Sequence, residues 1–528
     1  MSFTSIAFIG FIILTAIIYF IVPKRVRWGV LLAASYAFYF LSSPKTFIFV
    51  LITTISTFLC GRYLGIVQQK YKDYLDGHRE ELDKDQKKQL KAQNQKRKKA
   101  ILLTTLFLNI GILAFLKYFR VYIDSIAHLF GFYQFNFNVG ILIPLGISFY
   151  TFQSISYIID VYRGTCKPDK NIAKFALFIS FFPQIVQGPI SRYNQLAGQL
   201  YEGHGFDYTR IKFGAQLILW GFFKKVVIAD RVGILVNEIF DNYTDYLGFY
   251  LIIGALFYTI QIYADFSGGM EIARGVAQIF GIDMVKNFEQ PYFSKSIPEF
   301  WRRWHITLGQ WCRDYIFYPV SLSKTFGKLG KQSRSILGNR VGKLLPVIIA
   351  QLLTFLTIGV WHGAEFKYIA YGLYQAVFII GGILCEPYLI KLTKLLRINT
   401  ETFSWKLFQI LRTFTLIVVG RYFSRGVSFA AALIMMKNSL VFNPRVFFDG
   451  SLFDLGLTQG DFRILLVALI IWFVVSLMQE KGISIRETLA QQNLVFRWII
   501  YIAAVCFILI FGIYGSGYDT SGFIYREF

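Results

Sequence analysis

The sequence predicts an all-α integral membrane protein that crosses the bilayer about eleven times. Hydrophobic residues make up 55% of its 528 residues and charged residues only 16%, whereas soluble domains carry about 25% charged residues. The hydrophobic residues gather in runs long enough to span a bilayer as helices. Basic residues recur in the short loops between alternate runs, as the positive-inside rule expects. We therefore expect one polytopic domain over residues 1–528, with re-entrant or interfacial helices among the spans.

The first apolar run, residues 3–22, has no basic residue before it and is followed by Lys24, Arg25 and Arg27. A signal peptide has the opposite order of charge, so we expect this run to anchor the chain with its N-terminus outside. The other expected spans, in chain order, are 28–41, 45–65, 101–116, 140–159, 344–360, 368–384, 407–419, 464–477 and 498–513. Residues 213–229 and 247–264 are expected to form further helices, in a part of the chain where the alternation of sides is not set by basic loops.

Three segments between these runs have a different character. Residues 68–100 are polar, with eleven Lys and Arg against six Asp and Glu, and their spacing predicts an amphipathic helix on the cytoplasmic surface. A plain solvated tether is the alternative for that segment. Residues 120–139 are expected to form an outside loop. Residues 173–186 are apolar but too short for a comfortable span, which favours a re-entrant segment that runs into Gln187.

The candidate catalytic residue is His362, in the motif GVWHG between two long apolar runs. An ionisable side chain at membrane depth is costly, so a functional role is the default interpretation. Neutral imidazole has a small desolvation penalty and still accepts a proton near neutral pH. The flanking glycines leave room for a substrate. A structural histidine that hydrogen-bonds between helices is the alternative.

A second candidate is His305, within a block over residues 287–319 that interleaves aromatic residues and arginines. Pro298 indicates a helix start, and the composition suits a buried or interfacial helix. Arg302 and Arg303 are candidate contacts for the phosphates of a nucleotide-like donor, although membrane orientation explains basic residues equally well. Asp265 ends an apolar run beside two glycines and is a candidate partner of an imidazole or an arginine, or of a broken helix end.

The sequence contains none of the motifs expected of a hydrolase, an ATPase or a metalloenzyme. There is no P-loop, no GxSxG, no HExxH and no spacing of zinc ligands, and five scattered cysteines form no CxxC pair. The net charge of +24 lies in short loops, where orientation explains it without nucleic acid. An imidazole without an obvious protein nucleophile suits general-base activation of an acceptor hydroxyl or thiol against an activated acyl donor.

The chain resembles the membrane-bound O-acyltransferase family, and within it the bacterial alginate O-acetyltransferase branch. The resemblance covers nearly the whole chain, including its closing YGSGYDTSGFIYREF. It rests on FFPQIVQGPISRY (181–193), YADFSGGMEIARG (263–275), PEFWRRWHITLGQWCRDYIFYP (298–319) and GVWHGAEFKYIAYGLYQ (359–375). The second of these motifs departs from the FDFSGYSD-like pattern of the family, which puts the role of that segment in doubt.

The resemblance implies tilted helices around a central funnel, with His362 as the catalytic histidine and His305 near the same tunnel. It implies an O-acetyltransferase of the bacterial cytoplasmic membrane that passes an acetyl group from acetyl-CoA to an exported or cell-wall polysaccharide. The implied partners are an SGNH-hydrolase-like protein outside the membrane and the membrane lipids. Acetyl-CoA is a co-substrate, and we expect no bound cofactor or metal. The candidate substrate-binding residues are Trp361, Trp304, Arg302, Arg303, Asp265 and Gln187.

Two alternatives remain. The first is a D-alanyl transferase of teichoic acids that is fed by a carrier protein. Residues 68–100 and the C-terminal motif favour the alginate branch over it. The second is a transporter that uses His362 in a proton relay. The absence of an evident inverted repeat, together with the paired WHG and RRWH motifs, argues against transport.

Overall fold

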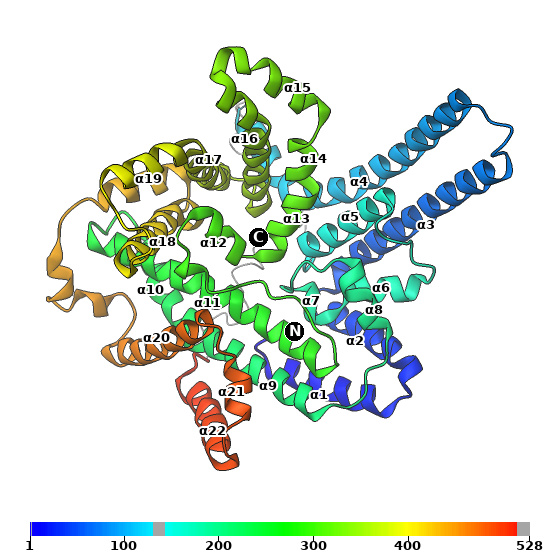
Figure 1. The fold of residues 1–528 in the computed structure, drawn as a ribbon. Helices are drawn as coiled ribbons and strands as arrows, with labels where there is room; N and C mark the ends of the chain where they lie inside the picture. Colours follow the sequence, from blue (N-terminus) through cyan, green and yellow to red (C-terminus); the bar gives the residue numbers. More distant parts are fainter. Residues whose placement is uncertain (2, 130–142, 515–528) are drawn as a thin grey trace. The chain divides into compact units, whose positions relative to one another are not determined.

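The structure of the protein is a computed structural model that describes residues 1, 3–129 and 143–514. Every regular element in these ranges is a helix, and one isolated β-bridge joins Phe288 and Trp304. Within the same ranges, eight helices are long and apolar enough to cross a membrane. The predicted all-α polytopic membrane fold is therefore confirmed, and Figure 1 shows its helices in chain order.

The described residues group into two compact units. Unit 1 comprises Met1–Ala215 and Ala273–Val285, and unit 2 comprises Gln216–Ile272 and Lys286–Phe528. Two helices, α9 (Tyr208–Phe222) and α11 (Phe249–Ile279), each begin in one unit and end in the other. The chain therefore has no linker at these crossings, and the prediction of a single domain stays a prediction.

Unit 1 is a set of helices whose longest members form a hairpin. Its α3 and α4 run side by side in Figure 1 and pack against each other and against α5. The helices of unit 1, besides part of α9 and the end of α11, are α1 (Ile6–Ile21), α2 (Arg27–Ser42), α3 (Phe47–Gly77), α4 (Lys84–Leu129), α5 (Ile147–Arg163), α6 (Ile172–Ser180), α7 (Phe182–Ile185) and α8 (Tyr193–Tyr201), with short 3-10 turns at Lys24–Val26 and Pro44–Thr46.

Unit 2 contains the remaining helices and two segments of π-helix. Its helices are α10 (Asp230–Asp241), most of α11, α12 (Ile297–Arg303), α13 (Ile306–Cys312), α14 (Tyr318–Ser321), α15 (Lys324–Gln332), α16 (Arg334–His362), α17 (Phe366–Leu395), α18 (Phe403–Arg425), α19 (Phe429–Asn438), α20 (Gln459–Glu480), α21 (Ile485–Ala490) and α22 (Leu494–Phe511). The π-helical segments are η3 (Phe223–Ala229) and η5 (Arg313–Phe317), and 3-10 turns lie at Pro291–Phe293, Pro444–Phe447 and Ser451–Asp454.

The eight spanning helices are α3, α4, α11, α16, α17, α18, α20 and α22, and each contains one predicted span or helix, or most of it. The other predicted spans are shorter helices. Residues 3–22 and 28–41 correspond to α1 and α2. Residues 147–159 lie in α5, residues 143–146 precede this helix, and 140–142 lie outside the described residues. The predicted helix 213–229 is α9 continued by the π-helix η3.

Side-chain caps explain where many helices begin. Ser296 accepts a hydrogen bond from the Glu299 N–H at 3.3 Å, and Pro298 occupies the first turn of α12. This satisfies a backbone donor that has no partner within the helix, and Pro there loses no hydrogen bond. The helix start predicted at Pro298 is thus confirmed. Other capping side chains include Ser5, Asn171, Ser323, Thr402, Ser428, Thr458 and Asn493.

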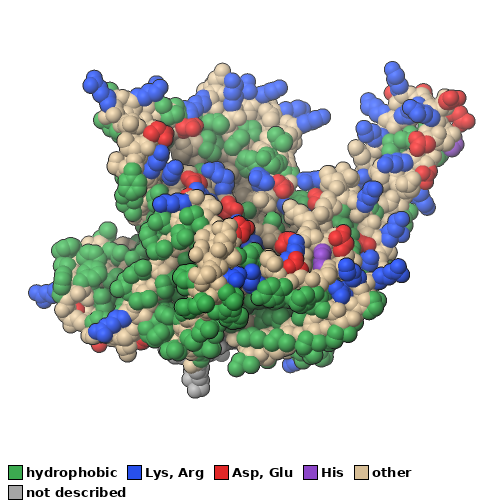
Figure 2. Space-filling view, turned by 60° about the horizontal axis from the view of Figure 1, so that its bottom comes forward, with side chains coloured by type: hydrophobic (Ala, Val, Ile, Leu, Met, Phe, Trp, Pro, Cys, Tyr) green, Lys and Arg blue, Asp and Glu red, His purple; other side chains and the backbone are tan. Residues whose placement is uncertain are grey.

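The polar segment 68–100 is not the single helix that its spacing predicted. Its first part completes α3, which ends at Gly77, and its second part begins α4. The new start is capped, because the Asp83 side chain accepts from the Gln86 N–H at 2.6 Å and the Gln86 side chain accepts from the Asp83 N–H at 3.1 Å. Figure 2 shows Lys, Arg, Asp and Glu side chains gathered over the outer part of this hairpin.

One other sequence prediction is changed by the structure, and a second stays a prediction. The outside loop expected at 120–139 is helical up to Leu129, because α4 continues through it, and residues 130–142 lie outside the described residues. Arginine is a good helix former, so Arg120 at the start of that segment does not end the helix. The segment 173–186 does break: Phe181, with ψ of 112°, separates α6 from α7. A nine-residue helix is about 14 Å long, which is too short to span a bilayer.

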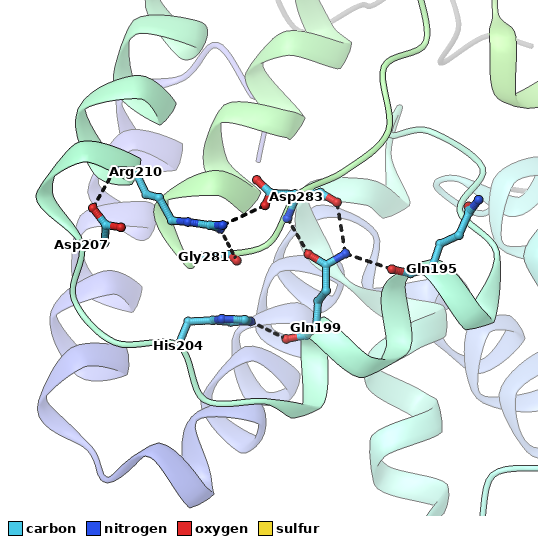
Figure 3. Close-up of polar contacts among 7 residues, drawn as sticks. All are labelled: Gln195, Gln199, His204, Asp207, Arg210, Gly281 and Asp283. Atoms are coloured by element: carbon cyan, nitrogen blue, oxygen red, sulfur yellow. Dashed lines mark hydrogen bonds and ion pairs between the residues drawn. The ribbon is translucent and has the colours of Figure 1, made fainter. Parts of the chain in front are cut away.

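Polar contacts tie Ala273–Val285 to the rest of unit 1 (Figure 3). The Arg210 guanidinium lies 3.0 Å from the Asp283 carboxylate and donates to the Gly281 carbonyl at 2.7 Å. The Gln199 side chain accepts from the Asp283 N–H at 2.8 Å and donates to its carbonyl at 3.3 Å. His204 Nε2 lies 2.7 Å from the Gln199 carbonyl. The Arg210 and Gln199 side chains thus satisfy backbone atoms where the chain leaves α11, and His204 bonds the backbone of α8.

The hairpin of α16 and α17 depends on two glycines that allow the backbones to approach closely. An alanine Cβ at Gly359 would lie 2.6 Å from the Tyr368 carbonyl oxygen, and one at Gly372 would collide with the Phe355 carbonyl. Small residues at helix interfaces permit this kind of close packing in membranes. The contact places the end of α16, where His362 lies, directly against the first turns of α17.

We expect Gly372→Ala to destabilise the protein by about 1–3 kcal/mol, because the added methyl group forces the two backbones apart. Gly381 on the same helix is the matched control, since a Cβ added there would meet no other part of the fold within 4 Å. Gly381→Ala should be neutral or stabilising by up to about 1 kcal/mol, because alanine is the better helix former. Thermal unfolding of the detergent-purified variants measures both effects. Equal melting temperatures for the two variants would contradict the close-packing account.

Candidate active site

The half-buried His362 is the last residue of α16. The chain then turns through Gly363 into α17, whose residues Tyr368 and Tyr371 contact the imidazole. The ring centroid of His362 lies 6.4 Å from that of Tyr368 and 6.0 Å from that of Tyr371. The helix end therefore places the imidazole beside two aromatic rings.

His305 lies at the junction between α12 and α13 and has a left-handed backbone, with φ of 44° and ψ of 54°. This conformation is uncommon for a residue that carries a Cβ. It is held by pairing with the preceding strand-like segment: the Ile306 N–H donates to the Asn287 carbonyl at 3.0 Å, and the Glu289 N–H to the Arg303 carbonyl at 3.0 Å. The His305 side chain is almost fully buried, at 1% exposure. Strained backbone of this kind is concentrated at functional sites.

Trp361 joins the two histidines in one aromatic cluster. Its ring centroid lies 4.8 Å from that of His362 and 5.9 Å from that of His305. On another side, the His305 ring meets Phe266 of α11 edge to face at 4.9 Å. The structure thus brings together two histidines that are 57 positions apart in the sequence, with an indole between them. This proximity is what a shared site requires, and the catalytic roles of the two imidazoles stay predictions.

The environment of His305 determines its charge. Burial lowers the pKa of His305 from its ordinary value of 6.5 to about 3, because transfer from water disfavours the charged form. The imidazole is therefore neutral at physiological pH. A neutral ring carries one N–H and one lone pair, so His305 is suited to orient a group by hydrogen bonding and not to hold a positive charge.

Arg421 of α18 completes the cluster from another direction. Its guanidinium lies 5.2 Å above the ring of Trp304, and its Nη1 donates to the Tyr371 hydroxyl at 3.5 Å. Since Tyr371 also contacts His362, the predicted residue Trp304 is linked to the catalytic candidate through this arginine. The sequence contained a signal for Arg421, because it is a basic residue within a long apolar helix. The predicted span 407–419 ended before it and missed it.

The predicted residue Asp265 belongs to a group of buried ionic side chains. Its carboxylate lies 2.6 Å from Lys225 Nζ, and Lys225 also lies 2.8 Å from Asp230. Lys224, next in the chain, donates to the Ser267 hydroxyl at 2.8 Å and pairs with Glu271. Asp265 therefore pairs with a lysine, a partner that the sequence analysis did not name. Two adjacent lysines within an apolar run were the overlooked signal.

The three remaining predicted site residues are Arg303, Arg302 and Gln187. Arg303 forms ion pairs with Glu299 at 2.8 Å and Glu480 at 2.7 Å, which occupy its guanidinium. Arg302 is exposed. Gln187 belongs to unit 1 and is buried. In the part of the chain that the structure describes, no three His, Cys, Asp or Glu side chains are arranged to hold a metal ion.

The sequence of this chain is similar to those of known membrane-bound acyltransferases. Residues 168–424 match the membrane-bound O-acyltransferase family, and the match includes both histidines. The chain is 36% identical over 322 residues to a probable alginate O-acetylase of Pseudomonas syringae pv. tomato, which covers 60% of this chain and 56% of that protein.

Two further relatives match a larger share of their own length. A probable alginate O-acetylase of Azotobacter vinelandii is 33% identical over 375 residues, covering 70% of this chain and 68% of that protein. A teichoic acid D-alanyltransferase of Bacillus subtilis is 32% identical over 295 residues, covering 54% of this chain and 69% of that protein. The chain spans only 50% to 60% of the length of the Pseudomonas relatives it matches.

Proposed function

We propose, from the premise that this chain belongs to the membrane-bound O-acyltransferase family, that it transfers an acetyl group from cytoplasmic acetyl-CoA across the membrane. The acceptor would be an exported or cell-wall polysaccharide, reached through an SGNH-hydrolase-like partner outside the bacterial cytoplasmic membrane. The observation that carries the proposal is the cluster in which Trp361 contacts both His305 and His362. The names of the Pseudomonas and Azotobacter relatives support acetyl as the transferred group.

The proposed chemistry needs one base and one leaving thiolate. The acceptor hydroxyl attacks the thioester carbon, an oxygen–carbon bond forms, and the carbon–sulfur bond breaks. His362 takes the proton from the hydroxyl and returns it to the departing thiolate, so the reaction releases no net proton. Neutral His305 orients a reacting group by hydrogen bonding. No protein-bound cofactor takes part, because acetyl-CoA itself supplies the activated acyl group.

A second candidate function is D-alanyl transfer from a carrier protein, which the likeness to the Bacillus subtilis teichoic acid D-alanyltransferase favours. The two functions share the attack on a thioester and differ in the acyl group and in what bears it. Both use the same two imidazoles, so the cluster alone does not separate them.

The donor is tested by offering the detergent-purified protein radiolabelled acetyl-CoA or a carrier protein loaded with radiolabelled D-alanine, each with a hydroxyl acceptor. We expect release of coenzyme A from the first donor and no turnover of the second. Turnover of the loaded carrier alone would replace acetyl transfer by D-alanyl transfer. Turnover of neither donor by folded protein would contradict both candidates.

A further inference from the structure

Asn287 is a buried amide, 2% exposed, in the segment between α11 and α12. Its Oδ1 accepts hydrogen bonds from the Thr307 N–H and from the Thr307 hydroxyl, both at 2.9 Å. Its Nδ2 lies 3.5 Å from the sulfur of Met270. A backbone N–H can only donate, so the atom that faces Thr307 must be the amide oxygen and not the nitrogen. The orientation of this amide is therefore determined by its neighbours.

The same oxygen lies 3.4 Å from Nδ1 of His305. An amide oxygen has no proton to give, so a hydrogen bond between these atoms requires the proton to be on Nδ1. A neutral imidazole carries a single ring proton. With Nδ1 protonated, Nε2 holds the lone pair and is able only to accept.

We infer that Asn287 is a positioning residue that fixes His305 in its Nδ1–H tautomer and so makes Nε2 a hydrogen-bond acceptor in the acyl-transfer site. The role of Nε2 towards a substrate rests on the proposed function. The tautomer of His305 does not, because it is a property of the protein alone. Nε2 is buried, and as an acceptor it orients an O–H or S–H group. It is unable to donate to the negative oxygen that develops on an attacked thioester. His305 thereby orients a neighbouring O–H or S–H group, because the single proton of the attacking hydroxyl goes to His362.

The tautomer is measured directly by ¹⁵N NMR of the full-length protein, labelled at histidine and reconstituted in lipid bilayers. A His305→Gln sample identifies the His305 signals by their loss. We expect Nδ1 of His305 to carry the proton and Nε2 to be unprotonated at pH 7. A protonated Nε2 in the wild-type protein would overturn the inference. This readout needs no substrate, so it stands even if the acetyl donor proves to be wrong.

Two variants separate positioning from a structural role. Asn287→Leu removes the acceptor oxygen, and we expect a loss of about 10- to 100-fold in kcat, by analogy with the loss when the hydrogen-bond partner of a metal-ligating histidine is removed. Asn287→Asp keeps an acceptor oxygen and hence the tautomer, but its carboxylate favours the charged imidazole and raises the pKa of His305. Since protonation converts Nε2 to a donor, the acidic limb of the kcat profile should move to higher pH in this variant.

Thr307→Val is the matched control. It removes one of the two hydrogen bonds between Thr307 and Asn287 but leaves the contact with His305, so the tautomer and the pH profile should stay as in the wild type. If Asn287→Leu does not fold, the NMR of the wild type and the pH profile of Asn287→Asp still decide the question. An unchanged pH profile and an unchanged kcat in a folded Asn287→Asp would refute the positioning role.

Discussion

Replacing His362 by alanine is expected to lower acyl-transfer turnover by about 10²–10⁴-fold, the usual contribution of general acid–base catalysis by a side chain. The imidazole lies at the end of α16, half-buried among Trp361 and the two tyrosines of α17. Removing it leaves the hydroxyl without a base, while the helix hairpin that carries it keeps its glycine contacts. Turnover is measured as release of free coenzyme A thiol from acetyl-CoA.

His78 is the matched control for that variant, because it follows α3 at the tip of the α3–α4 hairpin and is hydrogen-bonded to the Tyr74 carbonyl at an exposed position. His78→Ala should retain wild-type turnover. Melting temperatures within a few degrees of the wild type establish that both variants fold. A folded His362→Ala protein with normal turnover would rule out the general-base role.

Replacing Lys225 by methionine is expected to cost about 3–5 kcal/mol of stability, the usual effect of removing one partner from a buried ion pair. Lys225 is 2% exposed and lies between the carboxylates of Asp265 and Asp230. Without the ammonium group, Asp265, at 1% exposure, has lost its ion-pair partner in an apolar surrounding. Thermal unfolding in detergent measures the change.

Two comparisons identify the cause of that loss. The double variant Lys225→Met with Asp265→Asn should be more stable than Lys225→Met alone, because the second change removes the buried carboxylate. Lys406→Met breaks an exposed pair with Glu401, at 3.0 Å, and should change stability by less than about 1 kcal/mol. If Lys225→Met and Lys406→Met have the same melting temperature, the buried ion pair contributes no more to stability than the surface pair does.

The spanning helices were predictable because length and hydrophobicity alone identify them. The predicted spans 344–360 and 368–384 lie within α16 and α17, and predicting them did not require knowing which helices they pack against. Helix boundaries were harder. Gly77, Asp83 and Gln86 contain the stop signal and the capping pattern that divide α3 from α4, but the charge pattern of 68–100 was given more weight than these signals.

The two histidines were predictable as site candidates, whereas their surroundings were not. His362 and His305 were identified because an ionisable side chain in an apolar setting is energetically costly and is usually retained for a function. The contact of Phe266 with His305 and that of Lys225 with Asp265 each join residues about 40 positions apart, and no local periodicity specifies such pairs. The contact of Asn287 with His305 depends on the left-handed backbone at His305, which propensity does not predict for histidine.

The central claim is tested most directly in inside-out membrane vesicles that contain the wild-type protein or His362→Ala. Acetyl-labelled acetyl-CoA is supplied on the exposed cytoplasmic face, and a polysaccharide acceptor with its extracytoplasmic transferase is enclosed in the lumen. The account predicts label on the enclosed acceptor with the wild type and none with the variant. Label that reaches the acceptor equally with both proteins, or with neither while coenzyme A is still released outside, would contradict transfer across the membrane through His362.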